Sequence, residues 1–226
     1  MKPKLDPRGF PIVQIALDYP TIDEALAMAK IGVEAGVNWL EAGTPLIVAQ
    51  GIKAIGALAQ GFPDYTILAD YKTMDSGFKN VLLTDQQGAH VMTVCGNSPD
   101  ETVQSAIRQG KDSGIMVVVD TIGVKDQAGR AKLCEKWGAD MIYLHYGADQ
   151  RRADDTHDST QWLGEVIDAV GIPVGVGTFG VEDGVRAVAG GAALVCIGHP
   201  LITQDDPLAA LTEYVRQVKA SYRARQ

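Results

Sequence analysis

Short apolar runs alternate along the chain with longer segments in which apolar residues follow a helical spacing. The runs are rich in β-branched residues and begin near Ile12, Asn38, Thr66, His90, Met116, Met141, Pro173 and Leu194. Successive starts are 21 to 32 residues apart, enough for a strand, a turn, a helix and a second turn. Eight such units predict a single α/β domain over residues 1–226, a (β/α)8 TIM barrel. A doubly wound parallel sheet is the alternative.

The segment after the first run carries the signals of a complete helix. Thr21 and Glu24 form a T-x-x-E capping box, in which the side chains satisfy free backbone groups at the helix start. The apolar positions that follow share one helix face: Ile22, Ala25, Leu26, Ala29 and Val33. Gly36 is the expected end, because glycine accepts the left-handed backbone that often follows a last helical turn.

The composition indicates a sizeable core and an acidic surface. Of 226 residues, 46% are hydrophobic and 21% are charged, and the formal net charge is −8. This balance argues against a nucleic-acid partner, because such proteins usually carry a basic face. No apolar run has the length of a membrane span, and residues 1–6 lack the apolar core of a signal peptide. Cys95, Cys134 and Cys196 show no metal-binding spacing, so we expect buried thiols in a cytoplasmic protein.

Two carboxylates bracket one lysine at the end of the third predicted strand, in residues 69–75. Because side chains alternate along a strand, Asp70 and Lys72 point to the same side, and Asp75 lies in the loop beyond. A lysine between two anions is expected to stay protonated. This environment favours a proton donor or electrostatic clamp over a neutral, Schiff-base-forming nucleophile. The alternative is a buried ion pair without chemistry.

Further polar residues stand at the carboxyl ends of the predicted strands, the rim where barrels carry their active sites. The full set is Asp18, Glu41, Asp70, Lys72, Asp120, His145, Thr178 and His199. Glu41 and Asp70 lie on neighbouring strands, and two carboxylates suit Mg²⁺, which takes its other ligands from water or substrate. Such an ion would polarise a carbonyl group and stabilise an enediolate. Without a metal, Glu41 would form a salt bridge with Lys72.

Three side chains of this rim have two interpretations each. His145 either moves protons near neutral pH or is an ordinary core histidine. Asp18 and Asp120 either contact the substrate or accept hydrogen bonds from loops. Elsewhere, His90 starts a strand at the opposite rim, and His157 is expected at the surface. The tryptophans are expected to be packing residues: Trp39, Trp137 and Trp162.

Residues 175–180 read G-x-G-x-x-G, a spacing shared with dinucleotide-binding loops. A dinucleotide fingerprint opens the first strand–helix unit, whereas this one lies late in the chain, so we expect backbone amides that bind an anion. In barrels a phosphate often lies at the loops after the seventh and eighth strands. The candidates there are Gly177, Thr178, Gly198 and His199. The alternative is that the glycines serve close packing and tight turns.

A longer polar segment, residues 147–158, follows the sixth predicted strand. Long polar connections in compact domains are often functional, but many are simply solvated. The segment is either a lid that supplies Arg151 or Arg152 to an anionic substrate, or a solvated loop. We favour the loop.

Together these motifs resemble the orotidine-monophosphate decarboxylase-like barrels, and within them the branch of 3-hexulose-6-phosphate synthase and 3-keto-L-gulonate-6-phosphate decarboxylase. The resemblance covers most of the chain and rests on residues 14–18, 41–47, 70–75 and 122–124. It implies that Lys72, Asp75 and His145 carry proton transfer or enediolate stabilisation. It also implies that Asp18 contacts the substrate.

The same resemblance implies the partners of the chain. The substrate would be a sugar phosphate, and Mg²⁺ would be bound by Glu41 and Asp70. The chain would form a homodimer, with Asp75 projecting into the partner's active site.

Two details within the resemblance favour the synthase. Residues 73–74 and 145–149 are similar to synthase motifs, whereas the decarboxylase typically has an arginine where this chain has Ala148. The implied enzyme is an aldolase-type lyase. It removes a proton from C1 of ribulose 5-phosphate and adds the resulting enediolate to formaldehyde, giving hexulose 6-phosphate.

The phosphate end departs from the family pattern at Thr178, Phe179 and His199. A histidine at the last position is a weaker anion ligand than a permanently charged arginine. Two alternatives therefore stay open. One is decarboxylation of a 3-keto sugar acid phosphate such as 3-keto-L-gulonate 6-phosphate, and the other is a non-catalytic regulator that binds sugar phosphates.

Overall fold

Eight parallel strands close into a barrel in the computed structural model, which describes residues 5, 9–154, 156 and 158–222. Each strand pairs with the next along the chain, and the last pairs with the first. The strands are β1 (Ile12–Leu17), β2 (Trp39–Ala42), β3 (Thr66–Thr73), β4 (Val91–Cys95), β5 (Met116–Asp120), β6 (Met141–Leu144), β7 (Val174–Thr178) and β8 (Leu194–Ile197). The predicted (β/α)8 barrel is confirmed, and every strand begins within one residue of its expected start.

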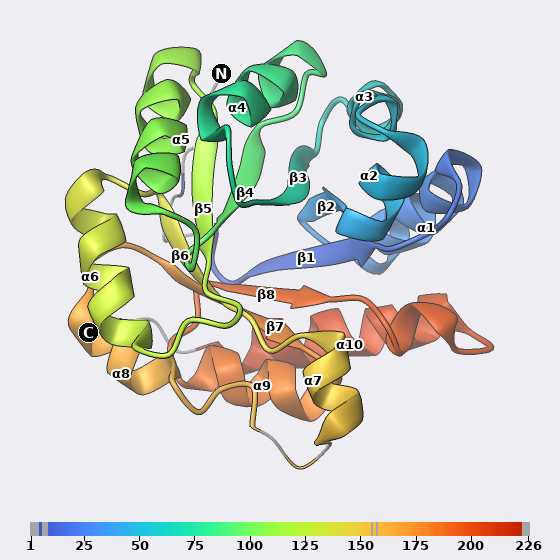
Figure 1. Cartoon of the computed structure of the whole chain (residues 1–226). Coiled ribbons are helices and arrows are strands. Elements are labelled where there is room, and N and C mark those ends of the chain that lie inside the picture. The colour runs from blue at the N-terminus through green and yellow to red at the C-terminus, as the bar shows by residue number, and fades with distance from the viewer. Residues whose placement is uncertain (1–4, 6–8, 155, 157, 223–226) are drawn as a thin grey trace.

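Helices surround this barrel (Figure 1). They are α1 (Ile22–Ala35), α2 (Thr44–Gln50), α3 (Lys53–Gly61), α4 (Gly77–Gln86), α5 (Asp100–Ser113), α6 (Gln127–Trp137), α7 (Ala148–Ala153), α8 (Leu163–Ala169), α9 (Val181–Ala189) and α10 (Pro207–Ser221), with a short 3₁₀ helix, η2 (Leu201–Thr203). The helix predicted after β1 is confirmed. Thr21 accepts a hydrogen bond from the Glu24 amide at its start, and Gly36 ends it with φ of 91°. Within the described residues, no helix combines the length and apolar character needed to cross a membrane.

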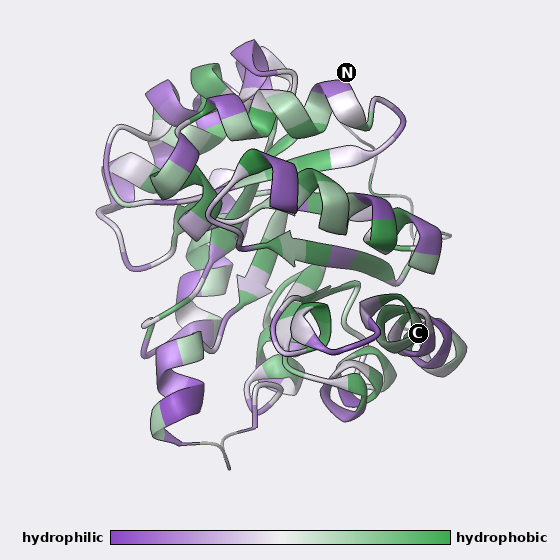
Figure 2. Cartoon of the chain, turned by 90° about the vertical axis from the view of Figure 1, so that its right-hand side faces the viewer, coloured by the Kyte–Doolittle hydropathy of each residue, from purple (hydrophilic) through white to green (hydrophobic). Residues whose placement is uncertain are grey.

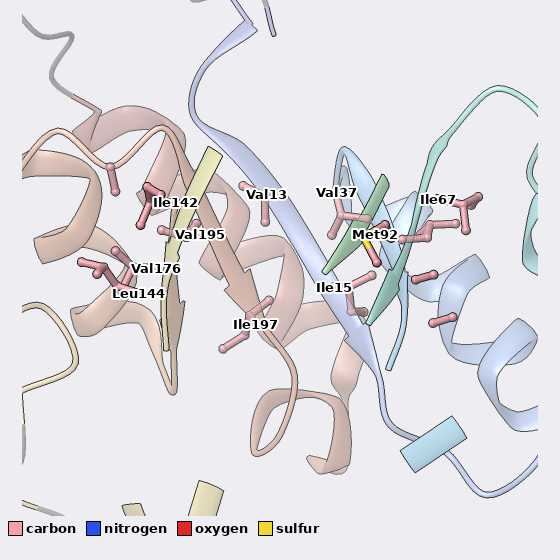
Figure 3. Close-up of a cluster of buried hydrophobic side chains, with 14 of the residues drawn as sticks. Val13, Ile15, Val37, Ile67, Met92, Ile142, Leu144, Val176, Val195 and Ile197 are labelled. Carbon is pink, nitrogen blue, oxygen red and sulfur yellow. The ribbon is translucent and has the colours of Figure 1, made fainter. Parts of the chain in front are cut away.

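Side chains alternate along each strand between the barrel interior and the layer beneath the helices. On β1, Ile12 lies in the interior cluster, whereas Val13 and Ile15 lie in the larger outer cluster shown in Figure 3. The interior cluster consists of Ile12, Trp39, Leu68, Val91, Met116, Val118, Met141, Leu194 and Cys196. Figure 2 shows hydrophobic strands inside and hydrophilic segments on the surrounding helices.

The inward-facing positions change from apolar to acidic toward the carboxyl ends of the strands. On three strands, an apolar residue of the interior cluster is followed two residues later by a buried carboxylate. These pairs are Trp39 with Glu41, Leu68 with Asp70, and Val118 with Asp120. Because side chains two residues apart on a strand face the same way, all three carboxylates point into the barrel at its carboxyl-terminal rim.

The minor predictions have mixed outcomes. All three cysteines are free and buried, and His90 lies at the amino-terminal end of β4, where its Nδ1 accepts the Ile67 amide at 3.1 Å. Trp39 is buried, and Trp137 packs against the core. The packing prediction is wrong for Trp162, which is 42% exposed because the next residue, Leu163, takes the buried position. His157 lies outside the described residues.

Close packing of α4 on α5 depends on Gly77, where an added Cβ would lie 2.5 Å from the Thr102 carbonyl oxygen. Because this obstacle is backbone, we expect Gly77→Ala to lower the free energy of unfolding by roughly 1–3 kcal/mol. Gly164→Ala in α8 is the matched control, since its Cβ would meet nothing within 4 Å. It should be neutral or stabilising by up to ~1 kcal/mol. Urea unfolding curves that coincide for the two variants would contradict this account.

Candidate active site

A cavity of about 610 Å³ opens at the carboxyl end of the barrel. It is lined by every strand-end candidate of the sequence: Asp18, Glu41, Asp70, Lys72, Asp120, His145, Gly177, Thr178, Gly198 and His199. Asp75 does not line it and lies exposed in the loop after β3. The rim prediction thus brings together all the candidates except the one expected to serve a partner subunit.

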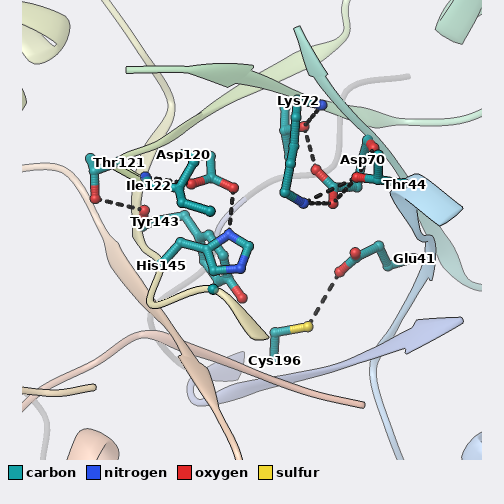
Figure 4. Close-up of polar contacts among 12 residues, drawn as sticks. Glu41, Thr44, Asp70, Lys72, Asp120, Thr121, Ile122, Tyr143, His145 and Cys196 are labelled. Atoms are coloured by element: carbon teal, nitrogen blue, oxygen red, sulfur yellow. Dashed lines mark hydrogen bonds and ion pairs between the residues drawn. The ribbon is translucent and has the colours of Figure 1, made fainter. Parts of the chain in front are cut away.

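Asp70 and Lys72 form an ion pair inside this cavity (Figure 4). Asp70 also accepts hydrogen bonds from the hydroxyls of Thr44 at 2.8 Å and Thr93 at 2.7 Å, and Lys72 Nζ donates to Thr44 Oγ1 at 3.1 Å. The pairing of β3 with β4 shifts register between Ala69 and Thr73, and Lys72 has a left-handed backbone with φ of 46°. Such an irregularity changes the direction in which the Lys72 side chain points, at some cost in backbone strain.

The electrostatics of this pair keep both groups charged. Burial disfavours the charged form of Lys72, but the carboxylates of Asp70, Asp120 and Glu41 outweigh it and raise the lysine pKa above its usual range. Burial likewise acts to raise the pKa of Asp70, yet Lys72 and the Thr93 hydroxyl bring it below its usual value. The predicted protonated lysine is therefore supported, and a Schiff-base nucleophile is disfavoured.

Glu41 lies on β2, the strand next to that of Asp70, and is held by contacts other than the salt bridge with Lys72 that was the alternative to metal binding. Its carboxylate accepts hydrogen bonds from Gln14 Nε2 and from the Cys196 thiol, the latter at 3.2 Å. Burial raises the pKa of Glu41 to about 8, and the nearby carboxylates of Asp70 and Asp18 act in the same direction. An isolated Glu41 would therefore hold a proton at neutral pH unless a cation replaced it.

The donors around Glu41 fit a divalent cation. The carboxylates of Asp18, Glu41, Asp70 and Asp120 all line the cavity, and among its described lining residues Lys72 is the single lysine or arginine. Gln14 Oε1 is buried and has no hydrogen-bond partner, so an acceptor oxygen stands beside Glu41. The described residues contain no cluster of three His, Cys, Asp or Glu side chains that could hold a metal ion. Two carboxylates with water or substrate are the usual arrangement for Mg²⁺.

His145 and Asp120 form a second polar pair across the cavity from Glu41 (Figure 4). His145 Nδ1 lies 2.7 Å from Asp120 Oδ2, and the other carboxylate oxygen accepts the Ile122 amide at 2.8 Å. The loop interpretation of Asp120 is thus confirmed, whereas its contact with substrate stays a prediction. A carboxylate on Nδ1 orients the imidazole and leaves Nε2 as the nitrogen that exchanges protons with a ligand.

The glycines of β7 make room for Tyr143, which projects from β6 into the barrel. Added Cβ atoms would lie 3.2 Å from the tyrosine ring at Gly175 and 2.9 Å from its hydroxyl at Gly177. Close packing, the alternative interpretation, therefore explains both residues. The Thr178 hydroxyl contacts the Tyr214 hydroxyl at 2.7 Å and donates to the Cys196 carbonyl oxygen at 2.9 Å. Anion binding at Gly177, Thr178, Gly198 and His199 stays a prediction.

The segment predicted as a solvated loop is solvent-exposed as expected but is not irregular, since residues 148–153 form the short helix α7. This helix begins at the cavity wall, because Gly147, Ala148, Asp149 and Gln150 all line it. Arg152 points to solvent and pairs with Asp149 at 3.2 Å. Arg151 is half-buried, and its guanidinium lies 5.5 Å from the centroid of the ring of Phe179, a residue that lines the cavity.

Comparison with known proteins assigns the chain to a family. Residues 11–214 match the model of the Orotidine 5'-phosphate decarboxylase / HUMPS family. The chain belongs to that family. It is similar to a 3-hexulose-6-phosphate synthase of Bacillus subtilis, with 36% identity over 137 residues, which span 61% of this chain and 65% of that protein. A protein of the same name from Methylomonas aminofaciens is 33% identical over 208 residues, 89% of this chain and 96% of the relative.

The likeness to this family extends to solved structures. The crystal structure of 3-hexulose-6-phosphate synthase from Salmonella typhimurium superposes with a TM-score of 0.88 at 30% identity. The superposition covers 93% of this chain and all of that chain, so the barrel is shared over nearly its whole length.

Five residues that line the cavity were not predicted as site residues from the sequence: Gln14, Thr44, Thr93, Tyr143 and Cys196. Four of these residues lie on strands and follow the same period of two as the predicted residues. Gln14 precedes Asp18 by four positions, Tyr143 precedes His145 by two, and Cys196 precedes Gly198 by two. Extending the inward-facing pattern back from each strand end, by one step for Tyr143 and Cys196 and by two for Gln14, would have found these three.

Proposed function

We propose that this chain is a Mg²⁺-dependent, aldolase-type carbon–carbon lyase. It would join ribulose 5-phosphate and formaldehyde to give hexulose 6-phosphate through an enediolate. The observation that carries the proposal is one cavity that holds a protonated Lys72 paired with Asp70 and, facing it, a histidine oriented by Asp120. The similarity to proteins named 3-hexulose-6-phosphate synthase supports the choice of reaction.

Each residue of the cavity has a role in this reaction. His145 Nε2 exchanges the C1 proton of the ketose, since Asp120 occupies the other ring nitrogen. The Lys72 ammonium stabilises the negative charge that develops on the enediolate oxygens, and the low exposure of the site strengthens that interaction. Glu41 and Asp70 would hold Mg²⁺, which supplies Lewis-acid polarisation of the substrate carbonyl when bound. Asp18 would contact substrate hydroxyls at the mouth.

Room for Asp18 at the mouth comes from Gly43. An added Cβ at Gly43 would lie 1.9 Å from Asp18 Oδ1, so the glycine lets the carboxylate reach the cavity. This close approach supports a role for Asp18 at the site rather than on an outer loop.

We also propose a homodimer in which Asp75 completes the partner's active site. The support is an exposed apolar strip on both sides of Asp75 in the sequence, formed by Met74 at 50% exposure, Phe78 at 42% and Leu82 at 45%. Phe78 and Leu82 are four residues apart on α4, so they share one helix face. Exposed apolar side chains grouped in this way indicate a protein interface. The free, buried cysteines support the cytoplasmic location that we propose with it.

We expect Leu82→Glu to convert the dimer into a monomer, because a charge would be buried at the interface. Leu133→Glu is the matched control, since Leu133 on α6 is equally exposed at 43% and lies outside the strip. Sedimentation velocity measures both masses. A monomeric wild type, or equal masses for the two variants, would contradict the proposed interface.

The function is tested by mixing the protein with ribulose 5-phosphate, formaldehyde and Mg²⁺ and measuring hexulose 6-phosphate. Product formation that depends on Mg²⁺ supports the proposal. Release of CO₂ from 3-keto-L-gulonate 6-phosphate in place of this reaction would favour the decarboxylase. Tight binding of sugar phosphates without turnover would favour the regulator.

A further inference from the structure

A second, smaller cavity of about 220 Å³ lies beside the main cavity at the carboxyl end of the barrel. It is formed by the loop after β5, the start of α6, the segment that leads from β6 into α7, and the residues just before α8. His145, Tyr146 and Gln150 line both cavities, so the two spaces share one wall. The proposed reaction uses the main cavity alone.

Two residues that line the second cavity carry a buried polar atom without a hydrogen-bond partner among the described residues: Gln127 at Oε1 and Ser159 at Oγ. Each of these residues is only 8% exposed. The Gln127 amide has a fixed direction, because its Nε2 donates to the carbonyl oxygens of Thr121 at 3.1 Å and Val124 at 2.8 Å. Its Oε1 is therefore an acceptor that needs a donor. Since buried polar groups are nearly always paired, these two atoms indicate a hydrogen-bonding ligand.

The composition of this lining favours a neutral ligand. The described residues of the second cavity include no aspartate, glutamate, lysine or arginine. Its histidine, His145, is already paired with Asp120. An ion bound there would lose its hydration without gaining a countercharge, which is costly.

Trp162 gives the second cavity an apolar wall. It lines the cavity and is 42% exposed, and Val124 and Leu144 add aliphatic surface. An indole combines a flat apolar face with one N–H donor. A polyol suits such a wall, because its C–H groups pack on the ring while its hydroxyls donate and accept hydrogen bonds. The cavity volume far exceeds the roughly 10–15 Å³ that a single water requires, so a small organic molecule fits.

We propose that the second cavity binds a small neutral polyol. The ligand donates a hydroxyl to Gln127 Oε1, forms a hydrogen bond with the Ser159 hydroxyl and packs on Trp162. This inference goes beyond the proposed function, because it requires no turnover. Since His145 belongs to both linings, a ligand in the second cavity lies against the histidine of the active site without entering the space of the substrate.

An NMR titration of the full-length protein with glycerol tests the site. The chain has three tryptophans, and Trp162→Phe assigns the indole N–H signal of Trp162 by removing it. We expect glycerol to shift this signal saturably and to leave the signals of Trp39, in the barrel interior, and Trp137, on the larger core cluster, nearly unchanged. Glycerol 3-phosphate should bind more weakly, because it is charged. Unsaturable shifts of all three signals, or tighter binding of glycerol 3-phosphate, would overturn the proposal.

Ser159→Ala and Ser98→Ala are a matched pair of variants for this titration. Ser98 is also buried, at 5% exposure, but it is not among the described residues of either cavity, and it donates to the Cys95 carbonyl oxygen at 2.6 Å. Ser159→Ala should raise the Kd for glycerol about 2- to 10-fold, as expected for one lost hydrogen bond. Ser98→Ala should change the Kd by less than about twofold. Equal Kd values for the two variants would contradict the role of Ser159.

Urea unfolding of the same two variants, without polyol, shows whether the Ser159 hydroxyl is free. Ser98→Ala loses a hydrogen bond and should unfold at a lower urea concentration than the wild type. Ser159→Ala removes a hydroxyl that no described protein group satisfies, so its midpoint should equal or exceed that of the wild type. Equal losses would mean that ordered water already satisfies the hydroxyl, and the cavity would then be a water site only. Neither result bears on the proposed reaction, which is measured separately.

Discussion

Lys72→Met is expected to lower kcat/KM for the proposed reaction by roughly 10²- to 10⁴-fold, the range for removing a preorganised charge or proton donor from an active site. The methionine keeps most of the side-chain volume but removes the ammonium that faces the substrate. Exchange of the C1 proton of ribulose 5-phosphate in D₂O measures the loss at the first chemical step. Lys132→Met on α6 is the matched control, because Lys132 is exposed and lies outside both the cavity and the apolar strip of α4. Unchanged exchange in Lys72→Met would remove the lysine from the mechanism.

A second variant separates catalysis from stability at this position. Lys72→Met alone leaves Asp70 buried without its countercharge, which is destabilising when one partner of a buried pair is removed. Adding Asp70→Asn removes the unpaired charge, so the double variant should regain stability while activity stays low. Recovery of activity in the double variant would show that the loss came from misfolding.

Glu41→Gln is expected to stabilise the metal-free protein increasingly as the pH rises from about 5 to 8. The folded-state pKa of Glu41 is about 8, and its ordinary value is 4.5. Between these values, the folded protein holds a proton that the unfolded chain has released. The contribution of Glu41 is therefore most favourable below pH 4.5 and is lost as the pH approaches 8. Glutamine stays neutral and avoids this loss, which is on the order of a few kcal/mol for a shift of several pKa units.

Urea unfolding in EDTA at pH 5, 7 and 8.5 measures this difference. Adding Mg²⁺ should stabilise the wild type most at high pH, where Glu41 can ionise to bind it, and should have little effect on Glu41→Gln. Glu213→Gln is a contrasting control, since hydrogen bonds from Arg216 and Gln217 lower the pKa of Glu213 to about 2. That stabilisation is present above the ordinary pKa and is lost in acid, so removing it has the opposite pH dependence. A pH-independent difference for Glu41→Gln would contradict the raised pKa.

The fold was predictable because each strand carries a local signal. Apolar runs ended by glycine-containing turns located all eight strands, and the rule that barrels place chemistry at carboxyl strand ends located Glu41, Asp70 and His145. Both inferences need only the spacing of residues along the chain.

The parts that escaped prediction depend on contacts between distant segments or on irregular backbone. The pairing of Asp120 with His145 joins two strands, and the role of Gly177 becomes clear only when Tyr143 is placed against it. The left-handed backbone of Lys72 sits at a register shift that no pattern of alternation predicts. The short helix that carries Arg151 is polar on most faces, so it gives no apolar stripe.

The alternation of side chains along the strands limits how such a site can change. Deleting one residue between Trp39 and Glu41 would turn the carboxylate outward beneath the helices and bring an aliphatic residue into the cavity. Deleting two residues of β2 ahead of Glu41, Trp39 and Leu40, would keep the carboxylate facing inward but shift it by about 6.6 Å along the strand, one full layer of the barrel. Length changes in the strands are therefore all but forbidden, and the loop that leads into α7 is constrained as well, because it carries His145. New substrate preferences in this barrel are expected to arise by changes in the length of other loops and by point substitutions. The carboxylates of Glu41, Asp70 and Asp120 would keep their positions along the strands.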